Sequence, residues 1–139
     1  MNVLVDTSVW SLLLRHKPTA QNEHQLQKLK TVVAELIHAQ QVRLIGNIRQ
    51  ELLSGIIHQA QFDKLETTLS AFADETVTYQ DYISAAQCFN QCRAQGIQGS
   101  HVDFLICAVA INHNLRILTT DKDFSHYQKV LDVDVWLLE

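Results

Sequence analysis

The order of hydrophobic and polar positions along the chain predicts short strands that alternate with helices. The strands are expected where three or four apolar residues follow one another without a helical period, as in strands buried on both faces. We expect five of them, at residues 3–5, 42–45, 75–78 (the weakest), 116–118 and 133–136. Amphipathic or apolar helical segments are predicted between them, at residues 9–15, 22–40, 59–72, 82–95, 103–112 and 122–127, with one more that ends near Gly55.

This alternation predicts the fold class. Strands that are each followed by a helix form a parallel sheet with helices on both of its faces. We therefore expect an α/β fold, a three-layer α/β/α domain with a central parallel sheet of four to five strands. One Pro and four Gly in 139 residues leave no linker that would divide the chain, so residues 1–139 are expected to form a single domain.

Two sequence patterns predict where helices begin, and one predicts where a helix ends. Asn47-x-x-Gln50 and Ser100-x-x-Asp103 are similar to capping boxes, in which two side chains bond the free amides at a helix start. Gly96 follows the 82–95 segment, where a glycine commonly terminates a helix.

Four acidic residues stand where an apolar segment is expected to pass into a turn or a helix. These residues are Asp6, Glu51, Asp103 and Asp121. In open α/β sheets, ligands bind at the carboxyl ends of the strands. Oxygen atoms are the ligands that Mg²⁺ and Mn²⁺ prefer. Four acids gathered at one end of the sheet would therefore form a hard-metal site.

Each acid also has a structural interpretation. Asp6 fits a helix N-cap, Glu51 fits the edge of a helix's buried stripe, and Asp103 fits the third position of a capping box. Asp121 and Asp123 both follow the 116–118 strand, and either residue suits the start of the next helix. We favour Asp121 as the ligand, because it is nearer the strand end, and Asp123 as an outer-shell or second ligand. Clustered carboxylates repel one another, so such a group indicates a cation or a catalytic task.

The net charge of −4 is not the basic balance of a typical nucleic-acid-binding protein. It does not exclude RNA, because every bound divalent ion adds two positive charges where a phosphate would lie. Candidate phosphate contacts near the predicted carboxyl edge are Arg15, His16, Lys17, Arg49 and Lys122. His101, two residues before Asp103, is a further candidate substrate contact.

Cysteine usage and hydropathy bear on the compartment. Three cysteines, an odd number in predicted helices, indicate reduced thiols. No apolar run reaches membrane-spanning length, and the N-terminus is typical of a first strand rather than a signal peptide. We expect a cytoplasmic protein with no membrane partner.

Four short motifs together resemble the PIN-domain nucleases, and most closely the VapC toxins of bacterial toxin–antitoxin pairs. The motifs are Val5-Asp6-Thr7-Ser8, Glu51-Leu52, Asp103-x-x-Ile106-x-Ala108 and Thr119-x-Asp121-x-Asp123-Phe124. The resemblance covers the whole chain in the right order. It implies that Asp6, Glu51, Asp103 and Asp121 are the metal ligands, with the choice between Asp121 and Asp123 open. It also implies that the hydroxyls of Thr7 and Thr119 support these ligands.

The resemblance further implies an endoribonuclease that depends on Mg²⁺ or Mn²⁺ and hydrolyses RNA phosphodiester bonds. Such toxins are usually homodimers restrained by a cognate VapB-like antitoxin. We expect the dimer to be built partly from the helix around residues 26–37 and from the region of Trp10.

Two other functions share features with this sequence. A haloacid-dehalogenase-type phosphotransferase needs a second Asp where this chain has Ser8. A catalytically silent PIN-like or receiver-like module would bind a metal or a partner without cleaving anything. That module predicts a broken acid set, whereas all four positions carry Asp or Glu.

Overall fold

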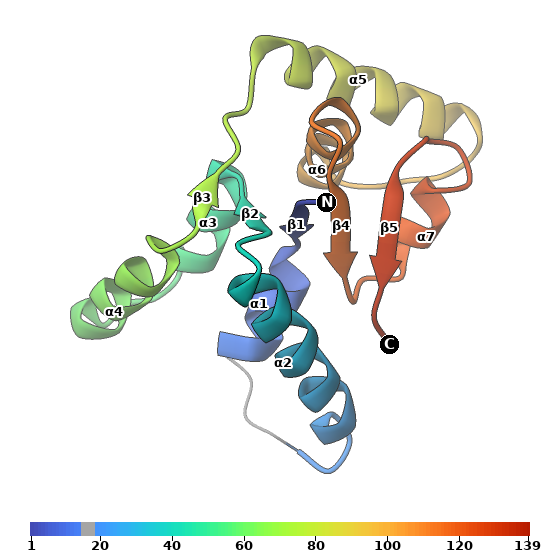
Figure 1. Ribbon diagram of the computed structural model, residues 1–139. Helices are drawn as coiled ribbons and strands as arrows, with labels where there is room; N and C mark the ends of the chain where they lie inside the picture. Colours follow the sequence, from blue (N-terminus) through green and yellow to red (C-terminus); the bar gives the residue numbers. More distant parts are fainter. Residues whose placement is uncertain (15–18) are drawn as a thin grey trace.

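A five-stranded, all-parallel sheet in the order β3-β2-β1-β4-β5 lies at the centre of the fold (Figure 1). The computed structural model describes residues 1–14 and 19–139. The strands are Val3–Val5 (β1), Val42–Leu44 (β2), Ala73–Asp74 (β3), Arg116–Thr119 (β4) and Asp134–Leu137 (β5). The parallel α/β sheet predicted from the sequence is confirmed.

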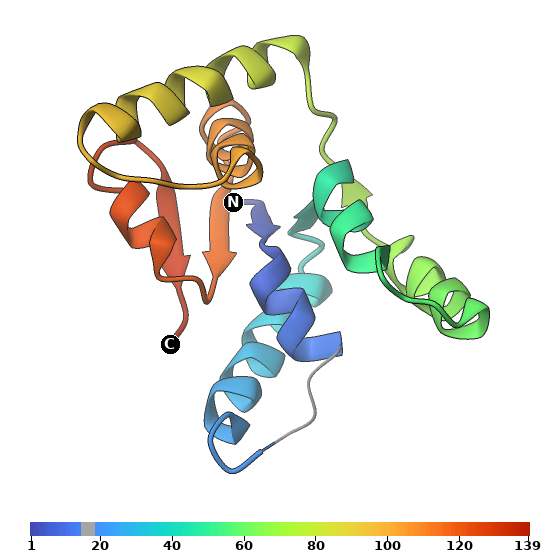
Figure 2. The ribbon, with the colours of Figure 1, turned by 180° about the vertical axis from the view of Figure 1, so that it is seen from behind.

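Seven helices surround the sheet within the described part of the chain. They are Thr7–Leu14 (α1), Glu23–His38 (α2), Gly46–Leu53 (α3), Gln59–Leu69 (α4), Tyr79–Ala94 (α5), His101–Asn112 (α6) and Asp123–Tyr127 (α7). Helix α1 packs beside α2, and α3 and α4 project together at the β3 edge of the sheet (Figure 2). Helices α6 and α7 pack against β4 and β5.

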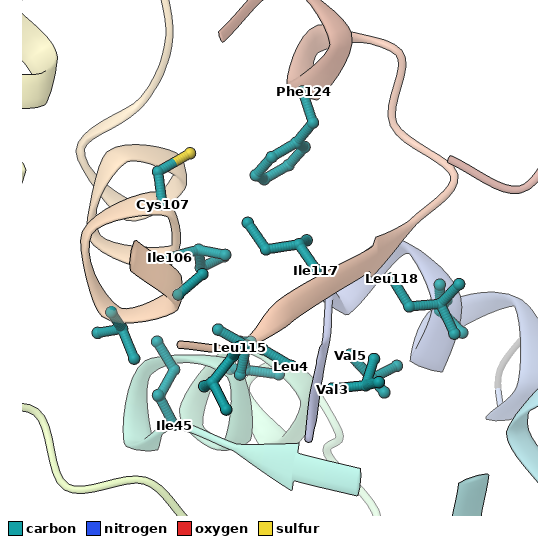
Figure 3. Close-up of a cluster of buried hydrophobic side chains, with 14 of the residues drawn as sticks. Val3, Leu4, Val5, Ile45, Ile106, Cys107, Leu115, Ile117, Leu118 and Phe124 are labelled. Atoms are coloured by element: carbon teal, nitrogen blue, oxygen red, sulfur yellow. The ribbon is translucent and has the colours of Figure 1, made fainter. Parts of the chain in front are cut away.

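The hydrophobic core lies on both faces of the sheet. Ile117 and Leu118 are adjacent in β4 and both fully buried, but they point to opposite sides of the strand (Figure 3). Ile117 points toward Ile106 of α6 and Phe124 of α7 (Figure 3). Residues 104–110 of α6 are all buried, as predicted for a helix that is apolar on every side.

The predicted strand at 75–78 is wrong, because this segment leads into α5 instead. The third strand is shorter and lies at Ala73–Asp74. Thr78 and Asp81 form a capping box: Thr78 Oγ1 accepts a bond from the Asp81 amide (3.2 Å), and Asp81 Oδ2 accepts one from the Thr78 amide (2.8 Å). Helix α5 therefore begins at Tyr79, three residues before the predicted start.

The capping box predicted at Asn47 is also wrong. Helix α3 begins at Gly46 without a side-chain cap. At Ser100 half of the predicted box is present, since Ser100 Oγ accepts a bond from the Asp103 amide (3.0 Å). Gly96, with a φ of +75°, follows the end of α5 as predicted. None of the described helices is long and apolar enough to cross a bilayer.

The expected dimer surface near Trp10 stays a prediction, but the Trp10 side chain itself belongs to the core of the chain. Trp10 is 3% exposed, and its Nε1 donates a hydrogen bond to the carbonyl oxygen of Val5 (3.1 Å). Its ring contacts Phe72 at a centroid distance of 5.1 Å. On α2, Ile37 is 43% exposed, whereas the inward-facing residues of that helix are buried in the chain itself.

Candidate metal centre

The crevice at the carboxyl ends of β1 and β4 is set by the strand order. The chain runs from β1 to β2 and β3 on one side of the sheet, then returns to β4 and β5 on the other. Ligands of open α/β sheets bind where the order reverses in this way. Val5 pairs with Leu118, and the Asp6 amide donates to the Leu118 carbonyl oxygen (2.9 Å). Asp6 and Thr119 are therefore brought side by side at this crevice.

Asp6 is a buried carboxylate held by two hydroxyls. Its exposed fraction is 6%, and its Oδ2 accepts hydrogen bonds from Ser8 Oγ (2.8 Å) and Thr119 Oγ1 (2.9 Å). Burial raises the pKa of Asp6 above its ordinary value, and the bonds from Ser8 and Thr119 oppose that rise. The side chain is thus fixed in orientation while its charge remains costly.

Asp103 reaches the same crevice from the first turn of α6. This helix leads into β4, so its N-terminus lies at the carboxyl edge of the sheet. Asp103 Oδ2 accepts a hydrogen bond from the Tyr127 hydroxyl (2.7 Å). Burial raises the pKa of Asp103, the Tyr127 bond opposes this, and the charges of Asp6 and Asp121 raise it further. The charge on Asp103 is therefore disfavoured both by burial and by neighbouring carboxylates.

Asp121 and Asp123 complete the group. One carboxylate oxygen from each of Asp103, Asp121 and Asp123 lies within 4.8 Å of the others. The Asp121 amide donates to Thr119 Oγ1 (3.0 Å), and Asp121 Oδ1 accepts from the Asp123 amide (2.9 Å) at the start of α7. Asp121 thus supports the helix start and still contributes to the cluster. We call Asp6, Asp103, Asp121 and Asp123 the aspartate crevice.

Glu51 occupies a different environment from these four residues. It is exposed on α3, whose Ile48 and Leu52 are fully buried. Within the described residues it makes no hydrogen bond or ion pair, and it lies outside the group of three close carboxylates. Its role as a ligand stays a prediction that rests on the resemblance.

Two hydroxyl-bearing residues at the crevice were not identified as site residues from the sequence. The sequence indicates for Ser8 only a helix N-cap and a position that lacks an Asp. In the structure, Ser8 Oγ donates a hydrogen bond to Asp6 Oδ2 and accepts one from the Thr120 amide (3.0 Å). Tyr127 carried no signal, because its contact with Asp103 depends on how α7 packs. Conversely, the Thr7 Oγ1 atom is buried and has no hydrogen-bond partner in the described structure.

The candidate substrate contacts differ in their exposure and in the other side chains that they already contact. Arg15, with His16 and Lys17, lies outside the described residues. Arg49 forms an ion pair with Asp74 (2.7 Å). His101 is exposed and stacks on Phe89, with ring centroids 5.1 Å apart and planes 11° from parallel. Lys122 is exposed between the two aspartates that flank it in sequence.

The donor set of the aspartate crevice fits a small, hard cation. All its side-chain donors are oxygens, and none of its four acids takes part in an ion pair among the described residues. Oxygens on opposite sides of a Mg²⁺ ion lie about 4.2 Å apart. Adjacent oxygens on the ion lie about 2.9 Å apart, so the three carboxylates, which lie within 4.8 Å of one another, would have to move inward to close on it.

Known structures share this fold over nearly the full length of the chain. A chain of VapBC2 from Rickettsia felis, solved bound to a promoter DNA fragment, superposes with a TM-score of 0.78 at 13% identity, covering 100% of both chains. A chain of FitAcB from Neisseria gonorrhoeae gives 0.75 at 22% identity, covering 96% of both chains. A chain of VapBC-1 from nontypeable Haemophilus influenzae gives 0.74 at 17% identity, covering 99% of this chain and 98% of that one.

Sequence comparison assigns the chain to a family. No curated protein matches the chain significantly. Residues 3–130 match the PIN domain, a span that contains all four residues of the predicted acidic site and the neighbouring Asp123, along with every strand but the last. The chain therefore belongs to the PIN domain family.

Proposed function

We propose that this protein is a metal-dependent endoribonuclease that acts as the toxin of a toxin–antitoxin pair. The observation that carries the proposal is the convergence of Asp103, Asp121 and Asp123 within 4.8 Å, at the strand-order reversal and beside Asp6. The resemblance of the motifs to VapC toxins supports the substrate class, and the fold shared with VapBC chains agrees with it.

The residues of the crevice have separable tasks in this proposal. Asp6, Asp103 and Asp121 hold the cation, with Asp123 and Glu51 as the further candidates. Ser8 and Thr119 orient Asp6, so that its carboxylate does not have to be ordered when the ion arrives. When bound, Mg²⁺ or Mn²⁺ supplies a water of lowered pKa and neutralises charge that develops on the phosphate oxygens. Hydrolysis that breaks the bond between phosphorus and the 3′ oxygen would leave a 3′-hydroxyl on one product and a 5′-phosphate on the other.

The activity is tested on single-stranded RNA with Mn²⁺, with EDTA as the metal-free control. The wild type is expected to cut, and the ends are identified by labelling with and without phosphatase. Asp103→Asn should abolish the cut. Asp134→Asn is the matched control, because it removes a carboxylate that pairs with Arg116 on the surface. Mn²⁺ binding without cleavage of any RNA would instead support a silent metal- or partner-binding module.

The antitoxin is proposed to inhibit by filling the crevice with a cationic side chain rather than by unfolding the toxin. Several carboxylates without a cation of their own form a natural receptor for Arg or Lys. A groove between α1 and the α3–α4 pair, lined by both apolar and polar side chains, offers a docking surface for the rest of the antitoxin. It is lined partly by Leu14, Ile57 and Leu65, and Ile57 is 91% exposed.

This mode of inhibition is tested with the product of the neighbouring reading frame. Ile57→Asp should weaken the complex, whereas Ile111→Asp, a change at another exposed isoleucine outside the groove, should not. A structure of the complex with the aspartate crevice open to solvent would contradict the proposal.

A homodimer remains part of the proposal, built partly from α2 and from the surface near Trp10, whose own side chain is buried in the chain. Sedimentation at tens of micromolar, roughly the range of weak interfaces, measures the oligomeric state. A monomer across that range would remove this part of the proposal and leave the nuclease assignment unaffected.

A further inference from the structure

The phenol of Tyr127 ends at a carboxylate of the aspartate crevice. Tyr127 is the last residue of α7 and has an exposed fraction of 0%. Its hydroxyl donates to Asp103 Oδ2 at 2.7 Å. A hydrogen bond to an ionised acceptor is stronger than one between neutral groups, so this contact constrains the carboxylate. The hydroxyl and the acid come from different helices, α7 and α6.

Aromatic packing fixes where that hydroxyl lies. The ring of Tyr127 contacts Phe104 at a centroid distance of 4.9 Å and Phe124 at 5.2 Å, the latter edge to face. Both phenylalanines are buried, and Phe104 follows Asp103 directly in α6. The ring therefore has little freedom to rotate or withdraw from the acid.

Gly99 leaves the space that the hydroxyl occupies. A Cβ atom at this position would lie 2.5 Å from the Tyr127 oxygen and 2.8 Å from its Cζ atom. It would also lie 2.9 Å from Cζ of Phe104. The backbone of Gly99 has no positive φ, so the requirement for glycine is one of space and not of conformation. The position of the phenol oxygen is thus restricted by contacts with Gly99, with α6 and with α7.

We propose that Tyr127 is a positioning residue of the metal centre, whose hydroxyl holds the Asp103 carboxylate in the orientation that binds the divalent cation. This inference rests on the proposed function, because it assumes that Asp103 is a ligand. Partners that hydrogen-bond to a ligand fix its geometry, and their loss typically weakens metal affinity about 10- to 100-fold. The competing interpretation is that Asp103 merely satisfies a buried hydroxyl.

The test compares Mn²⁺ affinity of wild type and Tyr127→Phe, measured by the EPR signal of free Mn²⁺ during titration of the metal-free protein. The substitution keeps the ring and removes the oxygen. We expect the dissociation constant to rise about 10- to 100-fold. Tyr82→Phe removes the same atom from a residue that is 55% exposed and should leave the affinity unchanged. Thermal melts of all the metal-free proteins establish that they are folded.

Gly99→Ala provides a second variant that leaves every carboxylate and the tyrosine intact. The added methyl presses on the hydroxyl, so Mn²⁺ affinity should fall here too. Wild-type affinity in a folded Tyr127→Phe protein, even with a lower melting temperature, would overturn the positioning role and leave the nuclease proposal standing. A wild type that binds no Mn²⁺ would overturn the metal centre itself, and this inference with it.

Discussion

Two groups of carboxylates in this molecule differ in the charges that face them. In the aspartate crevice, four acids meet hydroxyls, backbone amides and one another. The second group, which we call the histidine clamp, consists of Glu75, Asp81 and His113. His113 Nδ1 lies 2.8 Å from Glu75 Oε2, and its Nε2 lies 2.8 Å from Asp81 Oδ2. Arg43 lies 3.5 Å from the other oxygen of Glu75.

The pKa shifts favour the charged forms of Asp81 and His113 in the clamp and the neutral forms of Asp6 and Asp103 in the crevice. Burial opposes ionisation of Asp81, but bonds from Thr78, Asn112 and His113 outweigh it and lower its pKa. Burial likewise opposes protonation of His113, and its two carboxylate partners raise its pKa nevertheless. In the crevice, the pKa values of Asp6 and Asp103 are raised.

This difference shows which acids serve the fold. The clamp joins the β3–α5 connection to the end of α6 with charges that compensate one another. The crevice keeps like charges together at a cost in stability, as expected where a cation from solution is to complete the site. Each of the following predictions tests one side of this comparison.

Asp103→Asn should have the largest effect, because it removes one charge from the crevice while preserving the side-chain shape. Mn²⁺ affinity should fall by more than the about 10- to 100-fold typical of outer-shell changes, and RNA cleavage should be lost. The metal-free protein should be no less stable, since a like-charge repulsion is relieved. If Asp103 served only the helix dipole, stability would instead drop by about 0.3–1 kcal/mol and cleavage would survive.

His113→Ala should break the clamp and leave the crevice intact. Asp81, only 1% exposed, would lose a charged partner, and the free energy of unfolding should fall by about 1–3 kcal/mol. Urea unfolding at pH 6 measures this loss. Mn²⁺ affinity should be unchanged in the folded variant, and a parallel loss of affinity would show that the two groups are coupled.

Asp121→Asn and Asp123→Asn should differ in their effect on Mn²⁺ affinity. Asp121 is half-buried and tied to Thr119 through its amide, whereas Asp123 is exposed. An ordered carboxylate has less entropy to lose on binding, so Asp121→Asn should weaken affinity more. Isothermal titration of the two variants side by side makes the comparison. The reverse order would assign the fourth ligand to Asp123.

Glu51→Gln should weaken Mn²⁺ binding less than Asp103→Asn does. Glu51 is exposed and lies outside the close group of three carboxylates. Its removal relieves no repulsion among buried charges, so the melting temperature of the metal-free protein should not rise. An effect on affinity equal to that of Asp103→Asn would place Glu51 fully within the crevice.

The smallest expected effect is a difference in pH dependence. Asp81 has a lowered pKa and His113 a raised one, so the clamp contributes fully between their ordinary values of 3.8 and 6.5. Its contribution is lost as pH rises through the folded pKa of His113 or falls through that of Asp81. The raised pKa values of Asp6 and Asp103 act differently: they reduce stability as pH rises from 3.8 through their folded values. Unfolding free energies of metal-free wild type and His113→Ala should therefore converge above the folded pKa of His113.

The sequence alone determined four of the five strands and all four acidic positions now found in the crevice, Asp123 among them as an outer-shell or second ligand. Apolar runs without a helical period marked β1, β2, β4 and β5, because burial on both faces removes polar residues from a strand. Asp6 and Asp121 were picked out by their position after such runs, and Asp103 by its place at the start of an apolar helix. These are local signals, readable within a few residues.

The tertiary structure alone decided the partners of those acids. Thr119 and Asp6 are 113 positions apart, and the register of β1 against β4 makes them neighbours. The bond from Tyr127 to Asp103, the bond from the Thr120 amide to Ser8 and the histidine clamp likewise depend on how separate elements pack. Side-chain partnership across such distances leaves no periodic trace in a sequence, because it is fixed by the geometry of packing and not by the pattern of burial along one element.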